Sequence, residues 1–537
     1  MTLFSRKKPA SCRDKQRRAN GAGYNALNDF DEDYRGDDDS CSLLPQDKQK
    51  RSQEFTLKRD VGLFSSITLL LGAIIGTGIF ITPGNVLRNS KTITIDLLLW
   101  TLGGVNALIG GLCAAELGAL LPASGGDYAF FLAAGRPYGV CGDLPAFFYA
   151  WTCFFLEPAA TSIQGLTFSA YLLSLPYPDC APPYEVNVLV SSLFITLATA
   201  MNCFSIRMST KVQDIFSGLK CAFLYAVIIT GAVYSFRGNH IWDTQPYSDT
   251  HPSVGDLAAA TYSAIYCYSG WNCINCVAEE VKNPGRNIPV AIAVSVIITV
   301  LTYLLVNLAF FVVLDAQTIA STDAVAVTFA RATWGRGMGA VMPLVIALTV
   351  FGSTCVDVLA SSRIFFAASR EGHLARFMSF VHVENSVPLA AVVARCILSL
   401  TLTLVGSVHF LIEVSILLGN VWEAVSVVSL LLLRRSMRDA PRPYRVPTVI
   451  AVLRLLVCVV LAGVTLVQVR RYAYQYAMLV ATFAIGAVYY YLFVWKKIRL
   501  RGSESVSLFL QKCLNSAPCA SELEKCVNEI GPVVEWD

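Results

Sequence analysis

Residues 61–87 read VGLFSSITLLLGAIIGTGIFITPGNVL, an apolar run with a glycine-rich interruption at its centre. A lipid bilayer is crossed by about 20 residues of helix, so this run is long enough to span one. Gly76 and Gly78 flank the small polar residue Thr77, where a simple membrane anchor would carry Leu or Val. Broken helices at membrane depth line cavities, and in transporters they carry the substrate site. The run therefore indicates transport, with a glycine-rich helix-packing face as the alternative.

The composition of the whole chain indicates a membrane protein. Of its 537 residues, 55% are hydrophobic and 15% are charged, and the mean hydropathy is +0.54. A soluble domain carries roughly 25% charged residues. Apolar runs predict twelve transmembrane spans, near residues 61–88, 95–121, 143–174, 187–204, 214–236, 254–280, 288–314, 339–368, 388–407, 409–433, 447–468 and 474–495.

The distribution of basic residues predicts the orientation of these spans. An even number of spans puts both termini on one side of the membrane. Arg434 and Arg435 follow the tenth span, and Lys496 and Lys497 follow the twelfth. Because such clusters mark cytoplasmic segments, we expect a multi-pass plasma-membrane protein with both termini in the cytoplasm. Residues 1–57, which hold basic and acidic blocks, are expected to form a disordered cytoplasmic tail, and residues 496–537 a second cytoplasmic tail.

The sixth predicted span carries a second interruption. Residues 266–272 read YCYSGWN, which places small and polar residues inside an apolar run. Two interrupted helices five spans apart are typical of inverted repeats. We therefore expect a first repeat of five helices in residues 58–236, a second in 254–433, and two further helices in 447–495. The recurrence of the break weakens the packing-face alternative.

Several further motifs follow one another along the chain. They are IGTGIF at 75–80, AELG at 115–118, SGGDY at 124–128, GWN at 270–272 with Glu279-Glu280, DAVAV at 323–327, SSR at 361–363 and SREGHL at 369–374. Together they resemble the light (catalytic) subunits of the heteromeric amino-acid transporters, within the amino acid–polyamine–organocation superfamily. The resemblance covers roughly residues 58–500. It implies an all-α membrane protein with twelve transmembrane helices in a LeuT-like fold, two inverted five-helix repeats plus two helices, with helices one and six unwound.

The resemblance also implies a function and a partner. The family consists of sodium-independent amino-acid exchangers, which work by alternating access together with a single-span glycoprotein heavy chain. The two chains are joined by a disulfide from an outward loop, and in this sequence that cysteine is Cys180, between the third and fourth spans. From the residues alone, a free thiol at Cys180 remains the alternative. A stand-alone transporter of the same fold, proton-coupled or facilitative, is the alternative function.

The implied substrate pocket lies between helices one and six. The amides of Gly76, Thr77 and Gly78 would bind the substrate carboxylate, because the N-terminus of a helix attracts anions. The carbonyls near Ile74 and on the unwound stretch Tyr266–Ser269 would receive the ammonium group.

Three further residues belong to the expected pocket. Tyr266 falls where the family commonly carries an aromatic lid over the substrate, with plain packing in the bundle as the alternative. Asn272 is the last residue of the second interruption, and Asn420 lies on the tenth span, where a cation would favour anionic substrates.

Lys220 is a cation in the middle of the fifth predicted span. A charge at the bilayer centre costs at least about 2.5–3.5 kcal/mol, so it should have a role or a partner. In the resembled fold a lysine here takes the place of a sodium ion between helices one and eight, which would explain sodium independence. The alternative is a structural ion pair with Asp357 on the eighth span.

Three acids inside predicted spans depart from the family pattern: Glu157, Asp357 and Glu423. Asp357 falls at the side-chain end of the implied pocket, where it would pair with the side chain of a cationic amino acid. If it neutralises Lys220 instead, the substrates are neutral. Glu157 stands where the family has an arginine, which makes an anionic substrate unexpected. Glu157 and Glu423 carry no assigned role.

Other classes of function lack a signal in this sequence. No metal-ligand cluster, nucleophile–base motif or phosphate-binding loop is visible, so we expect no enzyme, no cofactor and no metal. A channel would need pore-lining rings or a filter, and the paired breaks argue against it. The expected partners are amino-acid substrates, the heavy chain through Cys180 and membrane lipid, with no nucleic acid.

Overall fold

The computed structural model describes residues 59–76, 78–177, 182–204, 206–238, 251–322, 324–385, 387–405, 408–438, 440–468, 473–498 and 503–518. Several predictions lie outside these residues. They concern the N-terminal tail, Thr77 of the expected carboxylate site, Cys180 of the expected disulfide, and the end of the C-terminal tail.

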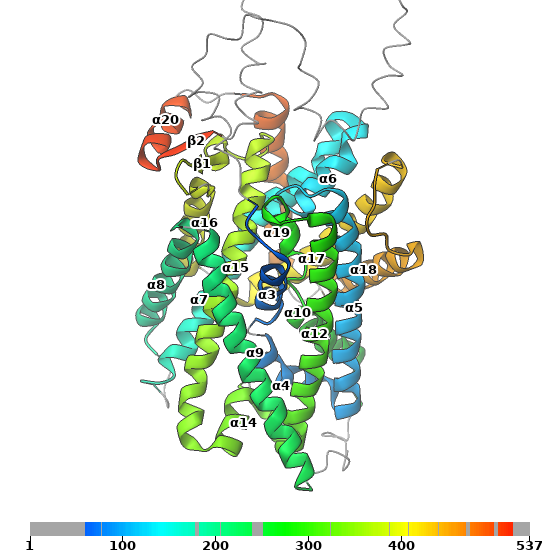
Figure 1. Ribbon diagram of the computed structural model, residues 1–537, viewed down its shortest axis with the longest axis vertical. Coiled ribbons are helices and arrows are strands. Elements are labelled where there is room, and N and C mark those ends of the chain that lie inside the picture. Colours follow the sequence, from blue (N-terminus) through cyan, green and yellow to red (C-terminus); the bar gives the residue numbers. More distant parts are fainter. Residues whose placement is uncertain are drawn as a thin grey trace, which may run out of the picture.

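The described chain is almost entirely helical, and most of its long helices run along one axis (Figure 1). The helices are α3 (Leu63–Ile74), α4 (Gly78–Ser90), α5 (Ile93–Leu120), α6 (Asp127–Gly135), α7 (Leu144–Leu173), α8 (Tyr184–Phe204), α9 (Ile206–Phe236), α10 (Val254–Cys267), α11 (Cys273–Cys276), α12 (Pro284–Val313), α13 (Ala316–Ser321), α14 (Val325–Trp334), α15 (Arg336–Arg370), α16 (Leu389–Val405), α17 (Val408–Ser436), α18 (Thr448–Gln468), α19 (Ala473–Tyr489) and α20 (Ser503–Cys513). Short 3-10 helices are η3 (Arg136–Asp143), η4 (Ala278–Glu280) and η5 (Arg376–Ser379), and a π-helical turn, η7 (Tyr490–Trp495), extends α19.

A small sheet joins two distant segments at one end of the helices. Strand β1 (Phe380–His382) pairs in antiparallel fashion with β2 (Ser516–Pro518), so that Val381 lies opposite Ala517. Figure 1 shows this sheet beside α20, at the end of the molecule that also carries α6.

Among the described residues, five helices are long and apolar enough to cross a membrane. They are Ile93–Leu120, Tyr184–Phe204, Asp214–Phe236, Pro284–Val313 and Gly337–Arg370. The pair α3 and α4, bent by 42° at its break, makes a sixth candidate span. Shorter apolar helices are Leu389–Leu404, Thr448–Val464 and Leu479–Trp495. The structure therefore has the helical character of a multi-pass membrane protein, while the count of twelve spans and the two inverted repeats stay predictions.

Both interruptions that the sequence predicts are present as breaks between helices. Helix α3 ends at Ile74 because the next residue, Ile75, leaves helical geometry with φ −78° and ψ 80°. Helix α10 ends at Cys267, and Gly270 in the following segment adopts φ +100°, a conformation that favours glycine. A Cβ atom on Gly270 would also lie 3.1 Å from the main chain of Ala73. The two breaks therefore touch backbone to backbone.

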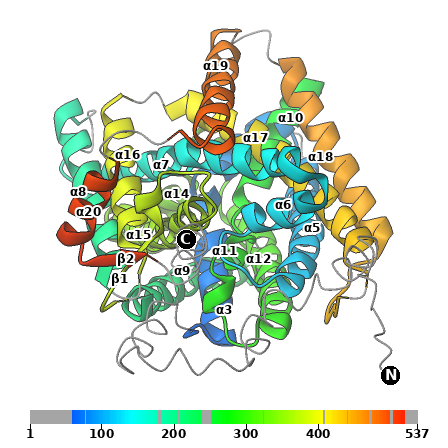
Figure 2. The same cartoon turned by 90° about the horizontal axis from the view of Figure 1, so that it is seen from above.

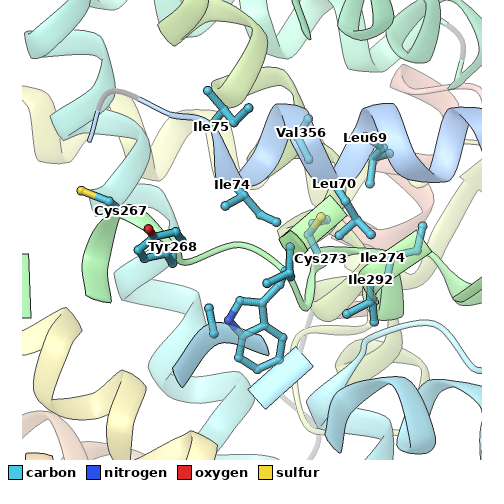
Figure 3. Packing of buried hydrophobic residues seen from close by; sticks show 14 of the residues in the cluster. Leu69, Leu70, Ile74, Ile75, Cys267, Tyr268, Cys273, Ile274, Ile292 and Val356 are labelled. Carbon is cyan, nitrogen blue, oxygen red and sulfur yellow. The ribbon is translucent and has the colours of Figure 1, made fainter. Parts of the chain in front are cut away.

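Apolar packing surrounds this contact. Figure 3 shows Leu70 and Ile74 of α3 facing the segment that connects α10 to α11, with Tyr268 at the α10 end of that segment and Ile274 on α11 at the other. All four side chains are buried. Seen from above, α3 lies between α9 and α12, whereas α8, α18 and α19 lie at the periphery (Figure 2).

The residues just before the N-terminus of α3 also form hydrogen bonds with the chain that follows α11. The Val61 amide donates to the Glu280 carbonyl at 3.0 Å, and the Lys282 amide donates to the Val61 carbonyl at 2.8 Å. These bonds form a parallel bridge between Val61 and Val281. Beside the bridge, Arg363 Nε on α15 donates to Glu280 Oε1 at 2.8 Å, and both side chains are buried.

We predict that this ion pair is needed for stability. Replacing one partner leaves the other as an unpaired buried charge, which costs about 3–5 kcal/mol. Glu280→Ala and Arg363→Met should each lower the midpoint of thermal unfolding of the detergent-purified protein, and the double variant should unfold at a higher temperature than either. Equal unfolding temperatures for all four proteins would contradict the role of the pair.

Candidate functional site

A cavity of about 100 Å³ lies where the two breaks meet. Six residues expected from the sequence line it: Ile74, Gly76, Gly78, Tyr266, Ser269 and Asp357. Six other lining residues come from the same region: Ala73, Gln164, Cys267, Gly270, Val350 and Ser353. The structure thus gathers segments of α3, α4, α7, α10 and α15 around one small space.

Two other residues expected in the pocket lie away from this cavity. Asn272 Nδ2 donates to Asp127 Oδ2 of α6 at 3.5 Å, and Ser426 of α17 donates to the other carboxylate oxygen at 2.9 Å. Burial raises the pKa of Asp127, and the hydrogen bonds from Ser426 and Asn272 oppose this shift. Asn420 is buried on α17. Asp127 therefore joins three segments of the fold, and Asn272, as one of its two donors, does not line the cavity.

The two glycines of the first break have different surroundings. A Cβ atom on Gly78 would lie 2.8 Å from Cys267 Sγ and 3.2 Å from Cys267 Cα, so this glycine allows α4 to approach α10 closely. A Cβ atom on Gly76 would have Ser353 Oγ, at 3.9 Å, as its nearest neighbour. The packing explanation for this glycine-rich stretch thus applies to Gly78, whereas Gly76 has no close packing neighbour.

The first turn of α4 supplies donors at the cavity. Helix α4 begins at Gly78, and the first amides of a helix have no partner within the helix. These amides also lie at the positive end of the helix dipole. The start of α4 is therefore suited to hold an anionic group.

Side chains from three other helices satisfy the carbonyls at the end of α3. Lys220 Nζ of α9 donates to the Gly72 and Ile75 carbonyls, both at 2.9 Å. It also donates to Ser353 Oγ of α15 at 2.7 Å. The Lys220 side chain is fully buried. The ammonium group thus links the first broken helix to α15 and uses three protons in doing so.

The Ile74 carbonyl is already occupied by two donors. Tyr303 Oη of α12 donates to it at 3.1 Å, and the Gly76 amide donates to it at 2.9 Å. The Tyr266 carbonyl likewise accepts from the amide and the hydroxyl of Ser269, at 3.1 and 2.8 Å. A carbonyl oxygen has two lone pairs, so a substrate ammonium at either position would share or displace a donor.

Lys220 and Asp357 do not form the ion pair that the sequence left open. Both residues lie in the described part of the chain, and Lys220 Nζ is more than 4.0 Å from both carboxylate oxygens of Asp357. Asp357 Oδ2 instead accepts from Gln164 Nε2 at 2.5 Å. Gln164 Oε1 in turn accepts from Thr354 Oγ1 at 2.6 Å.

Sequence reasoning missed Gln164 and two buried arginines. Arg395 of α16 donates from Nη2 to the Glu157 carbonyl at 3.2 Å and to Thr161 Oγ1 at 2.6 Å. Arg454 of α18 is paired with Glu423 of α17. The signal that could have found them is the same one that singled out Lys220, a strongly polar side chain inside an apolar span.

Comparisons with known proteins place the chain in a family. The amino acid permease family model matches residues 61–490. The b(0,+)-type amino acid transporter 1 of Mus musculus is 31% identical over 471 residues, which cover 86% of this chain and 94% of that protein. The Asc-type amino acid transporter 1 of Mus musculus is 35% identical over 409 residues, 75% of this chain and 76% of that protein.

A third relative is the large neutral amino acids transporter small subunit 2 of Rattus norvegicus. It is 33% identical over 405 residues, which cover 74% of each chain. These similarities extend over most of the chain, the family model includes both breaks, and together they confirm the family resemblance of the sequence motifs. The chain belongs to the amino acid permease family.

Proposed function

We propose that this chain is a sodium-independent amino-acid exchanger that moves neutral and cationic L-amino acids by alternating access. The observation that carries the proposal is the cavity at the meeting of two broken helices, in a chain similar to three kinds of amino-acid transporter. The corresponding architecture has twelve transmembrane helices, with inverted repeats in residues 58–236 and 254–433, two more helices in 447–495, and both termini in the cytoplasm.

The substrate carboxylate binds at the start of α4 in this proposal. Gly76, Thr77 and Gly78 supply main-chain amides, and the helix dipole adds attraction for the negative charge. The loose surroundings of Gly76 support this placement, because a Cβ atom there would have Ser353 Oγ, at 3.9 Å, as its nearest neighbour.

The ammonium group and the side chain lie toward the second break. Carbonyls of the stretch Tyr266–Ser269 receive the ammonium, since the end of α10 is the negative end of a helix dipole. Tyr266 is 44% exposed although it lines the cavity, which suits an aromatic lid that a substrate covers. Asp357 at the far side pairs with a cationic side chain.

Lys220 takes the place of a sodium ion in the proposed mechanism. Sodium-coupled relatives of such a fold need an ion to hold unwound carbonyls together. Here one ammonium group contacts two carbonyls of α3 and a hydroxyl of α15. A covalently attached cation needs no ion gradient, and this supports exchange without sodium.

A heavy chain completes the proposed transporter. Cys180 is expected in an outward loop, where a thiol can form a disulfide with a single-span glycoprotein. The similarity to a protein named as a small subunit supports an assembly of two kinds of chain.

Counterflow uptake tests the exchange itself. We expect labelled arginine, leucine and tyrosine to accumulate in cells or vesicles preloaded with amino acid, after co-expression with candidate heavy chains, and glutamate to be excluded. Uptake should be equal in sodium and choline media.

Lys220→Met should lower uptake at least about tenfold in both media, because it removes three hydrogen bonds made by a charged group. Uptake that requires sodium in the wild-type protein would refute the proposed role of Lys220.

A pair of glycine variants tests the carboxylate site. Gly76→Ala places a methyl group at the cavity without a clash, since its nearest neighbour would be Ser353 Oγ at 3.9 Å, so uptake should fall by about tenfold or more while the amount of folded protein at the surface stays unchanged. Gly78→Ala should lower the surface amount as well, because its methyl group would overlap Cys267. Gly463→Ala on α18, where a Cβ atom meets nothing within 4 Å, is the matched control. Normal uptake by Gly76→Ala would place the carboxylate elsewhere.

Non-reducing electrophoresis tests the partner. The native membrane protein should migrate as a band of higher mass that reducing agent converts to the single chain, and Cys180→Ser should remove this band. If the wild-type chain runs at its own mass without reducing agent, it acts without a disulfide-linked partner.

A further inference from the structure

Three polar side chains from two helices lie together at the Asp357 end of the cavity. Gln164 belongs to α7, whereas Thr354 and Asp357 belong to α15, where a spacing of three residues puts them on one helix face. Gln164 lies between the other two and bonds to both, at 2.6 Å to Thr354 and 2.5 Å to Asp357. Gln164 and Asp357 line the cavity, and Thr354 is fully buried.

The two bonds of Gln164 select one orientation of its amide group. An amide nitrogen only donates and an amide oxygen only accepts. With Asp357 ionised, the nitrogen must face the carboxylate, and the oxygen then faces Thr354 Oγ1, which donates to it. In the reversed orientation, Gln164 Oε1 would meet a carboxylate oxygen with no proton between them. The ionised form of Asp357 therefore sets the orientation of the amide. Thr354 Oγ1 also lies 2.9 Å from the Val350 carbonyl of its own helix, and because a hydroxyl can donate or accept, Thr354 holds the far end of the amide without choosing its orientation.

Asp357 forms no direct ion pair with a cation of the described chain. In the part of the chain that the structure describes, no Lys or Arg nitrogen lies within 4.0 Å of its carboxylate. Lys220 directs its protons to two carbonyls of α3 and a hydroxyl of α15. Arg395 directs Nη2 to a carbonyl and a hydroxyl of α7. Of the two carboxylate oxygens, Oδ2 is bonded to Gln164, and no described group donates to Oδ1.

We propose that Gln164 is a positioning residue that sets the preference of the cavity for cationic side chains. This assignment of Gln164 rests on the proposed function and adds to that function one residue and a chain of hydrogen bonds. Thr354 anchors the Gln164 amide, the amide nitrogen donates to the ionised Asp357, and Oδ1 then meets the ammonium or guanidinium group of the substrate. Without this chain the carboxylate can rotate or take up a proton, and the attraction for a cationic side chain is lost.

Uptake kinetics of arginine and leucine test the proposal in the full transporter, co-expressed with its heavy chain. Gln164→Met keeps the length of the side chain and removes both hydrogen bonds. We expect KM for arginine to rise relative to KM for leucine by at least about tenfold, the effect of losing one hydrogen bond to a charged group. Thr354→Val should raise the ratio of the two KM values by a smaller factor. Thr354→Ser, which keeps the hydroxyl group, should have the wild-type ratio.

Two further variants distinguish a positioning role from a structural one. Thr199→Val on α8 also removes a buried hydroxyl, one that bonds only within its own helix, and should leave the ratio unchanged. Asp357→Asn should lower the preference for arginine at least as much as Gln164→Met. If Asp357→Asn shifts the ratio and Gln164→Met does not, the positioning role is wrong and the proposed function stands. If neither changes the ratio, or if arginine is not transported, the assignment of Asp357 falls as well.

Discussion

The carbonyl groups at the end of α3 impose the constraint on which the rest of the structure depends. A helix that stops inside a membrane exposes carbonyls that lipid cannot bond, and each unsatisfied group costs several kcal/mol. Lys220, Tyr303 and Ser353 bond these carbonyls from α9, α12 and α15. Because three helices must bring donors to one point, their positions relative to the break are set together. The helix can end beside the cavity because these three side chains bond its last carbonyl groups.

The sequence was sufficient to locate both breaks, because glycine and polar residues inside an apolar run are local signals. It also placed Lys220 and Asp357 in the same region. It could not show which of the two glycines serves packing, because the answer depends on Cys267 of a distant helix. Nor could it show that the Ile74 carbonyl already has two partners, since one of them is Tyr303 of α12. Contacts between distant segments decide these properties.

Buried charges show the same limit. The sequence marks a lone acid in an apolar span, but its partner lies on another helix. Glu116 of α5 is bonded to Arg434 of α17, 318 residues away, and Glu423 is bonded to Arg454 of the next helix. Each pair fixes two helices side by side, because separating them would leave a charge without compensation. Among the three acids that depart from the family pattern, Glu423 thus has a structural partner, and Asp357 lines the cavity.

The bridge between Val61 and Val281 has a mechanical consequence. Helix α3 is held to the chain on either side of α11 at two points, by this bridge at one end and by the contact of Gly270 with Ala73 at the break. Two segments joined at two points keep a fixed angle between them. If α3 tilts away from α9 and α15 during a transport cycle, the segment around α11 moves together with α3 as one rigid body. Such a joint displacement would leave the floor of the cavity intact and open its side walls.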